Sequence, residues 1–159
     1  MKTFMTNTFR VLLLLAFPLL MTQCSKDDNN DNNQTPSELI IGSWQVTADV
    51  VSPPIDLGGG PVSDLYAILD PCDKDDLYII KANGVGEFNE GASKCDPADP
   101  QSEPFTWSLQ SNGTVLVISD GSSSANFQVA QLNQTTMKLV ITENILGTTY
   151  TETITYTRR

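Results

Sequence analysis

The sequence predicts an all-β protein, an eight-stranded antiparallel up-and-down barrel with one short helix between its first two strands. From residue 40 onward the chain consists of short β-prone runs separated by turn residues. Two of these separators are the Asn-Gly pairs 83–84 and 112–113, which tolerate the positive φ angles of tight hairpin turns. In the last run, 148–157, threonines alternate with larger side chains, as in a strand with one buried face.

Short connections join the eight expected strands. The strands span residues 44–51, 77–82, 85–89, 105–110, 114–119, 125–133, 136–143 and 148–157. Such connections place consecutive strands side by side, and closure into a barrel leaves no open sheet edge. We therefore expect a meander that closes on itself within a single domain, residues 38–159.

A helix is expected between the first two strands. Residues 62–69 carry apolar side chains at helical spacing, directly after the glycine-rich segment 58–61. Ser63 or Asp64 is suited to cap the first turn. At the end of a barrel such a helix either plugs the interior or forms a lid over a cavity, and the sequence leaves both interpretations open.

The N-terminal region predicts export. Residues 1–23 have the pattern of a signal peptide, with Lys2 and Arg10 before an apolar run, 11–21, that is shorter than the about 20 residues of a permanent span. The run leads into Met-Thr-Gln-Cys, which resembles a lipoprotein box with Cys24 as the lipid acceptor, although Gln23 replaces the usual small residue. The alternatives are an ordinary cleaved leader with an incidental cysteine, or a leader retained as an anchor.

The lipoprotein interpretation fixes the expected location. Residues 24–37 are predicted to be the lipidated cysteine and a disordered polar tether. Ser25-Lys26-Asp27-Asp28 resembles an export signal for the outer face of the outer membrane, and equally well fits a solvated spacer. We expect an outer-membrane lipoprotein whose domain lies outside the cytoplasm, with exposure at the cell surface as one alternative.

Charge and composition exclude several function classes. The chain has a net charge of −10, and loss of the leader with Lys2 and Arg10 makes it −12. The seven remaining basic residues are spread thinly, so we expect no nucleic-acid partner. The chain has no histidine, which rules out Ser/His and Cys/His nucleophile pairs and histidine-ligated zinc. We expect no enzyme, no catalytic residue and no cofactor.

The remaining cysteines predict a disulfide. Because lipid consumes Cys24, Cys72 and Cys95 are expected to pair in an oxidising compartment. Acidic residues surround both cysteines, namely Asp70, Asp73, Asp75, Asp76, Asp96 and Asp99. Calcium would suit such oxygen ligands, but the spacing does not match a calcium loop and solvated loops are the usual explanation, so no metal site is assigned.

Gly42-Ser43-Trp44, where the first expected strand begins, resembles the Gly-x-Trp motif of lipocalins. The chain resembles the small lipocalin-like domains of bacterial outer-membrane lipoproteins. The resemblance implies that Trp44 closes the bottom of the barrel beside Gly42, and that Arg158 or Arg159 packs across it through a cation–π contact. The helix between the first two strands is similar to the lid of fatty-acid-binding proteins.

Two functions follow from this interpretation. The first is binding of a small hydrophobic or amphipathic ligand in or at the barrel. Its expected lining residues are Tyr66, Phe127, Tyr150, Glu152 and Tyr156. Glu152 stands out because it shares a strand face with apolar neighbours, where a buried carboxylate needs a partner or a ligand. The second is a non-enzymatic interaction module of the cell envelope, with a barrel filled by its own side chains and a protein or glycan partner.

Overall fold

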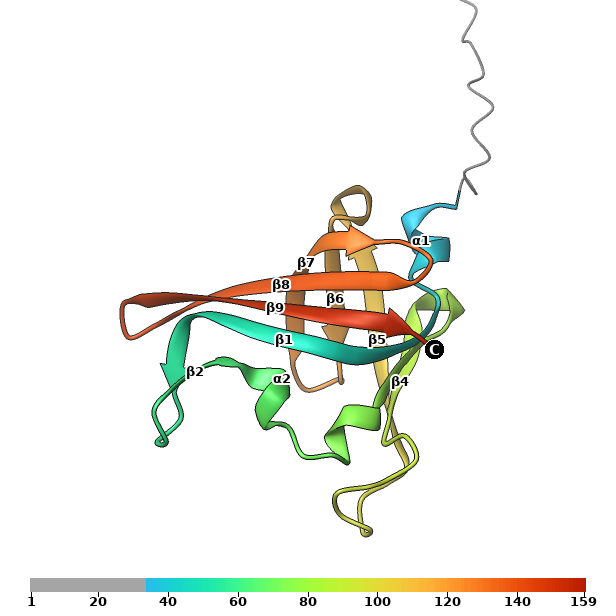
Figure 1. Ribbon diagram of the computed structural model, residues 1–159. Helices are drawn as coiled ribbons and strands as arrows, with labels where there is room; N and C mark the ends of the chain where they lie inside the picture. Colours follow the sequence, from blue (N-terminus) through green and yellow to red (C-terminus); the bar gives the residue numbers. More distant parts are fainter. Residues whose placement is uncertain (1–33) are drawn as a thin grey trace, which may run out of the picture. The chain divides into compact units, whose positions relative to one another are not determined.

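The computed structural model describes residues 34–159 (Figure 1). The predicted leader and Cys24 lie outside the described residues. In chain order the elements are α1 (Pro36–Leu39), β1 (Gly42–Asp56), β2 (Pro61–Asp64), α2 (Leu65–Ile68), the 3₁₀ turn η1 (Asp73–Asp75), β3 (Leu77–Ile80), η2 (Ala82–Gly84), β4 (Val85–Asn89), β5 (Ser102–Gln110), η3 (Ser111–Gly113), β6 (Val115–Ser119), β7 (Ser124–Leu132), β8 (Thr136–Ile145) and β9 (Thr148–Arg158). Within this part of the chain no helix is long and apolar enough to cross a membrane.

Eight of the strands form a closed antiparallel barrel. β1 pairs with β3, each strand from β3 to β8 pairs with the next, and β9 returns to pair with β1. Trp44 lies in register with Tyr78 on β3 and with Arg158 on β9. The predicted fold class, an all-β up-and-down barrel with one short helix after the first strand, is confirmed.

Both Asn-Gly pairs occupy hairpin turns, as predicted. Asn83 and Asn112 have φ angles of 65° and 57°, in the left-handed region that asparagine tolerates better than most residues. Gly113 follows with a φ of 89°, and a Cβ atom there would meet the Cβ of Pro36 at 2.7 Å. The turn therefore needs glycine both for its conformation and for the close approach of α1.

The segment between the first two barrel strands differs from the prediction. Residues 62–64 are not helical: Pro61–Asp64 forms β2, which pairs with the end of β1, and only Leu65–Ile68 is helix. The glycine-rich turn makes this pairing possible, because Oδ1 of Asp56 accepts hydrogen bonds from the backbone N–H groups of Gly58 and Gly60, at 2.8 and 3.2 Å. Asp64 then caps α2 by accepting from the N–H of Ala67 at 3.0 Å.

Regular structure also begins earlier in the chain than expected, before residue 38. The predicted tether, residues 24–37, ends inside α1, which starts at Pro36. Oε2 of Glu38 accepts a hydrogen bond from the backbone N–H of Thr35, the N-cap residue of α1, at 2.7 Å. This reciprocal capping, with proline in the first turn, stabilises a helix of only four residues.

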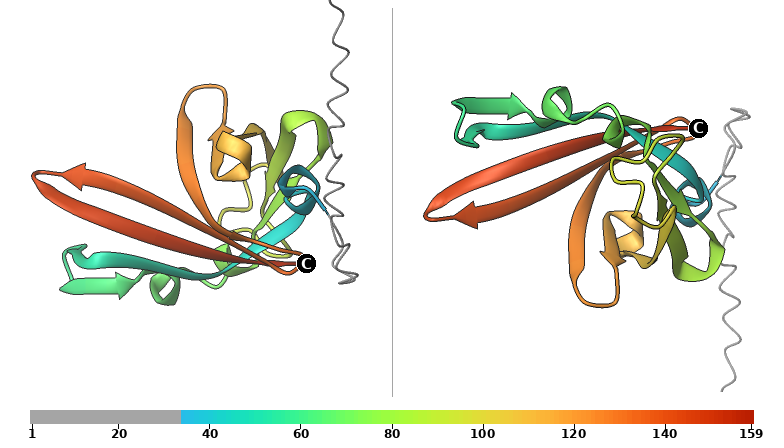
Figure 2. Two further views of the ribbon diagram at one scale, coloured as in Figure 1. Left: turned by 90° about the horizontal axis from the view of Figure 1, so that it is seen from above. Right: turned by 90° about the horizontal axis from the view of Figure 1, so that it is seen from below.

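The strands are uneven in length, and the long ones project from the barrel. β1, β8 and β9 have 15, 10 and 11 residues, whereas β3, β4 and β6 have 4, 5 and 5. The ends of the long strands extend past the shorter wall together with β2 (Figures 1 and 2). We call this projection, residues 50–64 and 141–152, the arm.

The hydrophobic core fills the end of the barrel opposite the arm, which we call the closed end. Its largest fully buried side chains are Trp44, Ile40, Ile80, Leu116, Met137 and Leu139. The indole N–H of Trp44 donates to the carbonyl oxygen of Ile40 at 2.7 Å, so its one polar atom is satisfied inside the core. The other end, where the arm begins, is the open end.

Arg158 joins the two ends of the domain. Its guanidinium carbon lies 4.3 Å from the centroid of the Trp44 ring. The same group donates to the carbonyl oxygens of Ile41 at 2.6 Å, of Gln134 at 2.5 Å, and of Leu39. A Cβ atom on residue 42 would lie 2.0 Å from Nη1 of Arg158, so only glycine leaves room for the guanidinium.

Arg158→Ala is expected to lower the free energy of unfolding by about 3 kcal/mol, because carbonyl oxygens lose charged donors and Trp44 loses its cation. Arg158→Lys should recover less than half of this loss, since an ammonium cannot donate in three fixed directions. Urea unfolding measures both values. Arg159→Ala is the matched control and should change stability by less than about 0.5 kcal/mol. Equal losses for the two alanine variants would contradict this role of Arg158.

Candidate functional site

A β-bulge in β1 determines which side chains face the barrel interior. The register steps from Val46 opposite Tyr156 to Ala48 opposite Thr155, so β1 carries one extra residue at this point. Simple alternation from Trp44 and Val46 would turn Val50 inward. The bulge instead turns Asp49 and Val51 inward: Val51 is 5% exposed and Val50 is 45% exposed.

The bulge is held in place by threonines. Oγ1 of Thr47 lies 3.3 Å from the carbonyl oxygen of Thr155, to which it donates, and 3.0 Å from Oγ1 of Thr157. Bulges of this kind commonly re-aim a side chain beside a functional site. Here the re-aimed side chain is a carboxylate, Asp49.

A cavity of about 310 Å³ lies at the open end, beyond the core. Its apolar and aromatic lining comes from β1, β3, β4, β9 and the segment after α2. These side chains are Val46, Leu69, Tyr78, Phe88, Ile154 and Tyr156. The barrel is therefore filled by its own side chains at the closed end and hollow at the other.

The remaining lining residues are all acidic: Asp49, Asp73, Asp76 and Glu152. No lysine or arginine belongs to the described wall of this cavity. One carboxylate oxygen of Asp49 and one of Asp76 are inaccessible to solvent and have no hydrogen-bond partner among residues 34–159. The cavity thus contains carboxylates that no basic side chain of its wall neutralises.

This environment makes two of the carboxyls hard to ionise. Burial, followed by the nearby negative charge of Glu152, raises the pKa of Asp49 to about 6. Burial and the charges of Glu90, Asp73 and Asp75 raise the pKa of Asp76 to about 6. Both carboxylates are charged at neutral pH, but at a free-energy cost that a cation in the cavity would offset.

Aromatic rings form the wall beside the carboxylates. The Tyr78 ring contacts Phe88 and Tyr156 edge-to-face, with centroids 5.4 and 5.5 Å apart. Tyr156 is only 4% exposed and lines the cavity. Burial raises the pKa of both tyrosines, so their hydroxyls stay protonated at neutral pH.

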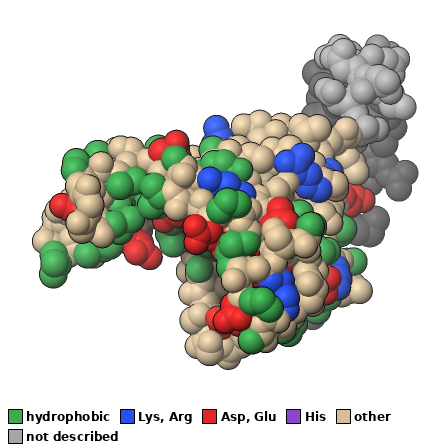
Figure 3. Space-filling model, turned by 60° about the horizontal axis from the view of Figure 1, so that its bottom comes forward, with side chains coloured by type: hydrophobic (Ala, Val, Ile, Leu, Met, Phe, Trp, Pro, Cys, Tyr) green, Lys and Arg blue, Asp and Glu red, His purple; other side chains and the backbone are tan. Residues whose placement is uncertain are grey.

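A second, smaller cavity of about 90 Å³ lies along the arm. It is mainly apolar, and its lining comprises Val51, Ile55, Leu65, Ile141, Glu143, Ile145, Tyr150 and Glu152. Glu152 lines both cavities, so the two are neighbours. Hydrophobic side chains gather on the arm, with acidic ones between them (Figure 3).

The structure separates the five expected lining residues into two groups. Tyr150, Glu152 and Tyr156 line the cavities. Phe127 packs against the core, away from both cavities. Tyr66 lies under Lys74, whose Nζ is 5.3 Å from the ring centroid. Asp49 and Asp76 were not expected on the cavity wall.

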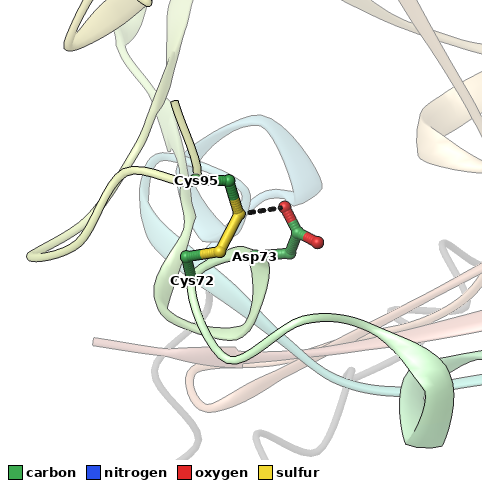
Figure 4. A group of neighbouring side chains, drawn as sticks. All are labelled: Cys72, Asp73 and Cys95. Atoms are coloured by element: carbon green, nitrogen blue, oxygen red, sulfur yellow. Dashed lines mark hydrogen bonds between the residues drawn. A yellow bond between two sulfur atoms is a disulfide. The ribbon is translucent and has the colours of Figure 1, made fainter. Parts of the chain in front are cut away.

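Cys72 and Cys95 form a disulfide, as predicted (Figure 4). Oδ1 of Asp73 lies 3.2 Å from Sγ of Cys95. A disulfide sulfur carries no proton, so this is a close sulfur–oxygen contact. Asp75 strengthens the same link between loops, because Oδ2 accepts from the N–H groups of Ala92 and Ser93 at 2.9 and 3.0 Å. The disulfide thereby pins the acidic segment that contributes Asp73 and Asp76 to the cavity.

The acidic loops do not form a compact cage of carboxylates. Within residues 34–159, the one group of three acidic or cysteine ligand atoms within 4.8 Å of each other is Cys72, Asp73 and Cys95. Two of these atoms are already bonded to each other as a disulfide. Calcium needs six to eight converging oxygens, and the arrangement offers one carboxylate.

The chain matches a known protein family. A family described as "Lipocalin-like domain" matches residues 40–139, which is 100 of the 159 residues. The matched region contains Trp44, the bulge and the disulfide, and ends within β8. No curated protein matches the chain.

The raised pKa of Asp49 predicts a pH-dependent effect of Asp49→Asn. Because the pKa is about 6 in the folded protein and 3.8 is the ordinary value, the folded state holds this proton more tightly than the unfolded chain. The free energy of unfolding therefore falls as pH rises from about 4 to about 6 and stays low above that range. Asp49→Asn should add about 1 kcal/mol at about pH 7.5, a value reduced for partial exposure, and nothing at about pH 4.

Urea unfolding at both pH values measures this difference. Glu103→Gln is the control, since Glu103 lies on β5 outside both cavities and its substitution removes the same charge. A loss of stability in Asp49→Asn near neutral pH would contradict the inward, strained position of this carboxylate.

Proposed function

Because the chain belongs to the lipocalin-like domain family, we propose that it is an outer-membrane lipoprotein that binds a small hydrophobic or amphipathic ligand at the open end of its barrel. Lipocalin-like barrels generally bind small hydrophobic ligands and are generally not enzymes. The proposal adds to this the location of the ligand and the attachment of the protein to the membrane.

The observation that carries the ligand site is the half-filled barrel. Core side chains from Trp44 to Leu139 fill the closed end, while a cavity of about 310 Å³ remains at the open end. Binding pockets for small molecules typically measure about 300–1,000 Å³ and combine apolar walls with a few polar groups. The volume of this cavity lies at the lower end of that range, and its wall combines apolar side chains with polar ones. The ligand is therefore small.

The helix α2 and the segment after it form the entrance in this proposal. Leu65 lines the smaller cavity and Leu69 the larger one, although α2 itself has only four residues. Glycines at 58–60 precede β2 and give the segment a flexible start. The lid interpretation is therefore favoured over a plug, because the segment borders the cavities.

Attachment to the membrane rests on the sequence. An apolar run at 11–21 leads directly to Cys24, and a polar segment separates this cysteine from α1. Two or three acyl chains on one cysteine anchor a protein stably, whereas one chain binds marginally. The domain in this proposal sits outside the cytoplasm, where the disulfide is stable.

One observation favours a second function, an interaction module for another envelope component. Leu57, Ile145 and Leu146 at the ends of the arm are 58%, 45% and 102% exposed. Exposed apolar groups of this size on a projecting element are typical of contact surfaces. This function is compatible with a ligand in the cavity, since the arm ends lie beyond the cavity wall.

Ligand binding predicts a mass difference. Native mass spectrometry of protein purified from its own cells should show a bound molecule in addition to the polypeptide. Leu69→Trp, which fills the larger cavity, should abolish this extra mass. Ile68→Trp is the matched control, because Ile68 is 55% exposed and lines neither cavity. An empty wild-type barrel, or loss of the ligand in the control alone, would contradict the proposed carrier function.

Lipid attachment predicts that Cys24→Ala moves the protein out of the membrane fraction and prevents labelling with palmitate. Cell fractionation and radiolabelled palmitate measure the two effects separately. Ser25→Ala, next to the acceptor, is the control and should leave both unchanged. Persistence of the label and of the membrane fraction in Cys24→Ala would exclude this anchor.

A further inference from the structure

We propose that the ligand of the larger cavity carries a positive charge, and that it is a small organic amine whose ammonium group binds between Asp49, Asp76 and Glu152. This inference rests on the proposed function, because it names the chemical class of the ligand in the same cavity. A lipocalin-like barrel for apolar ligands needs no charge at this position, and three carboxylates require an explanation.

The first argument is the direction of Asp49. Without the bulge at residues 46–48 this side chain would point away from the barrel, and Ala48 and Val50 would face inward. With the bulge, Val51 is buried in place of Val50, so the inner face keeps a valine. The net change on the inner face is a carboxylate in place of alanine, which is unfavourable for folding and is explained by binding.

The second argument is the set of unused acceptors. One oxygen each of Asp49 and Asp76 is buried without a partner in the described domain, and no basic side chain lines the cavity. The nearest lysine in the segment after α2, Lys74, lies over the ring of Tyr66, which does not line the cavity. An ammonium ion has three N–H donors and no acceptor, so it complements carboxylates that have no basic partner in the cavity.

The third argument is the wall beside the carboxylates. The Tyr156 side chain is 4% exposed and lines the cavity, and its hydroxyl is not among the solvent-inaccessible atoms without a partner, so the hydroxyl is open to the cavity. Its oxygen can accept an N–H bond from a ligand. The rings of Tyr78 and Phe88 line the same cavity, and aromatic rings attract cations.

The geometry favours an organic cation over a metal ion. A metal ion requires ligand oxygens that converge, and Asp49, Asp76 and Glu152 do not form a trio of ligand atoms within 4.8 Å of one another. An ammonium group needs only one or two of these carboxylates as hydrogen-bond acceptors, and the remaining negative charge attracts it across the cavity. The carboxylates are distributed around a space with aromatic walls. Such a space accommodates an ammonium group attached to a carbon chain, which gains both charge pairing and apolar contact.

The two cavities also fit the shape of an amphipathic amine. The larger cavity of about 310 Å³ holds the volume of roughly ten water molecules. The smaller cavity is mainly apolar and is bordered by the same Glu152. The charged group therefore binds in the larger cavity, and the hydrocarbon chain extends past Glu152 along the arm.

Isothermal titration calorimetry of the purified soluble domain, residues 34–159, at about pH 7.5 tests the charge preference with three probes of equal length, octylammonium, octanol and octanoate. The expected order of affinity is octylammonium above octanol above octanoate, with about tenfold between the first two. Asp49→Asn and Glu152→Gln should each weaken octylammonium about tenfold and leave octanol unchanged. Glu103→Gln, outside the cavity, should leave all three affinities unchanged.

The outcomes separate this inference from the proposed function. Equal binding of octanol and octylammonium, or tighter binding of octanoate, would overturn the amine and leave the apolar carrier standing. If none of the three probes binds, both the amine ligand and the apolar carrier function are overturned. Calcium chloride that binds in the same cavity and displaces octylammonium at a lower concentration would overturn the amine in favour of a metal ion. Circular dichroism of each variant verifies the fold, and Asp49→Asn is expected to be at least as stable as the wild type.

Discussion

The contact between Arg158 and Trp44 is the constraint on which the rest of the domain depends. It connects the first and last barrel strands through a cation–π contact and through hydrogen bonds to the carbonyl oxygens of Ile41, before β1, and of Gln134, in the turn between β7 and β8. Closure of a meander requires that its first and last strands meet in one register. Because Gly42 leaves room for the guanidinium and Trp44 anchors it in the core, the barrel has one well-defined closed end.

A fixed closed end allows the other end to serve a different purpose. Stability comes from the buried cluster around Trp44, so the residues beyond the bulge are free from the requirement to fill the interior. Asp49 and Asp76, whose pKa values are raised by burial, are tolerated there because the closed end supplies the necessary stability. This division between a packed end and a strained, hollow end is typical of proteins that place binding groups on a rigid barrel.

Local signals in the sequence were sufficient for most of the fold. The Asn-Gly pairs predicted hairpin turns and the alternating threonines predicted β9, because both signals lie within short stretches of sequence. The disulfide was predicted because Cys72 and Cys95 are the two cysteines that remain once Cys24 is assigned to lipid. The bulge at residues 46–48 could not be predicted, because it depends on the register between β1 and β9, which are far apart in sequence. Asp49 was missed for this reason; the adjacent valines at 50 and 51 were the only hint that the inward face changes.

The disulfide has a consequence for the proposed ligand site. With reduced cysteines, the segment that carries Asp73 and Asp76 loses its covalent link to the opposite loop and keeps the hydrogen bonds of Asp75. The rim of the cavity is therefore held most firmly in the oxidised protein. For a chain that is exported as proposed, oxidation outside the cytoplasm would then come before loading.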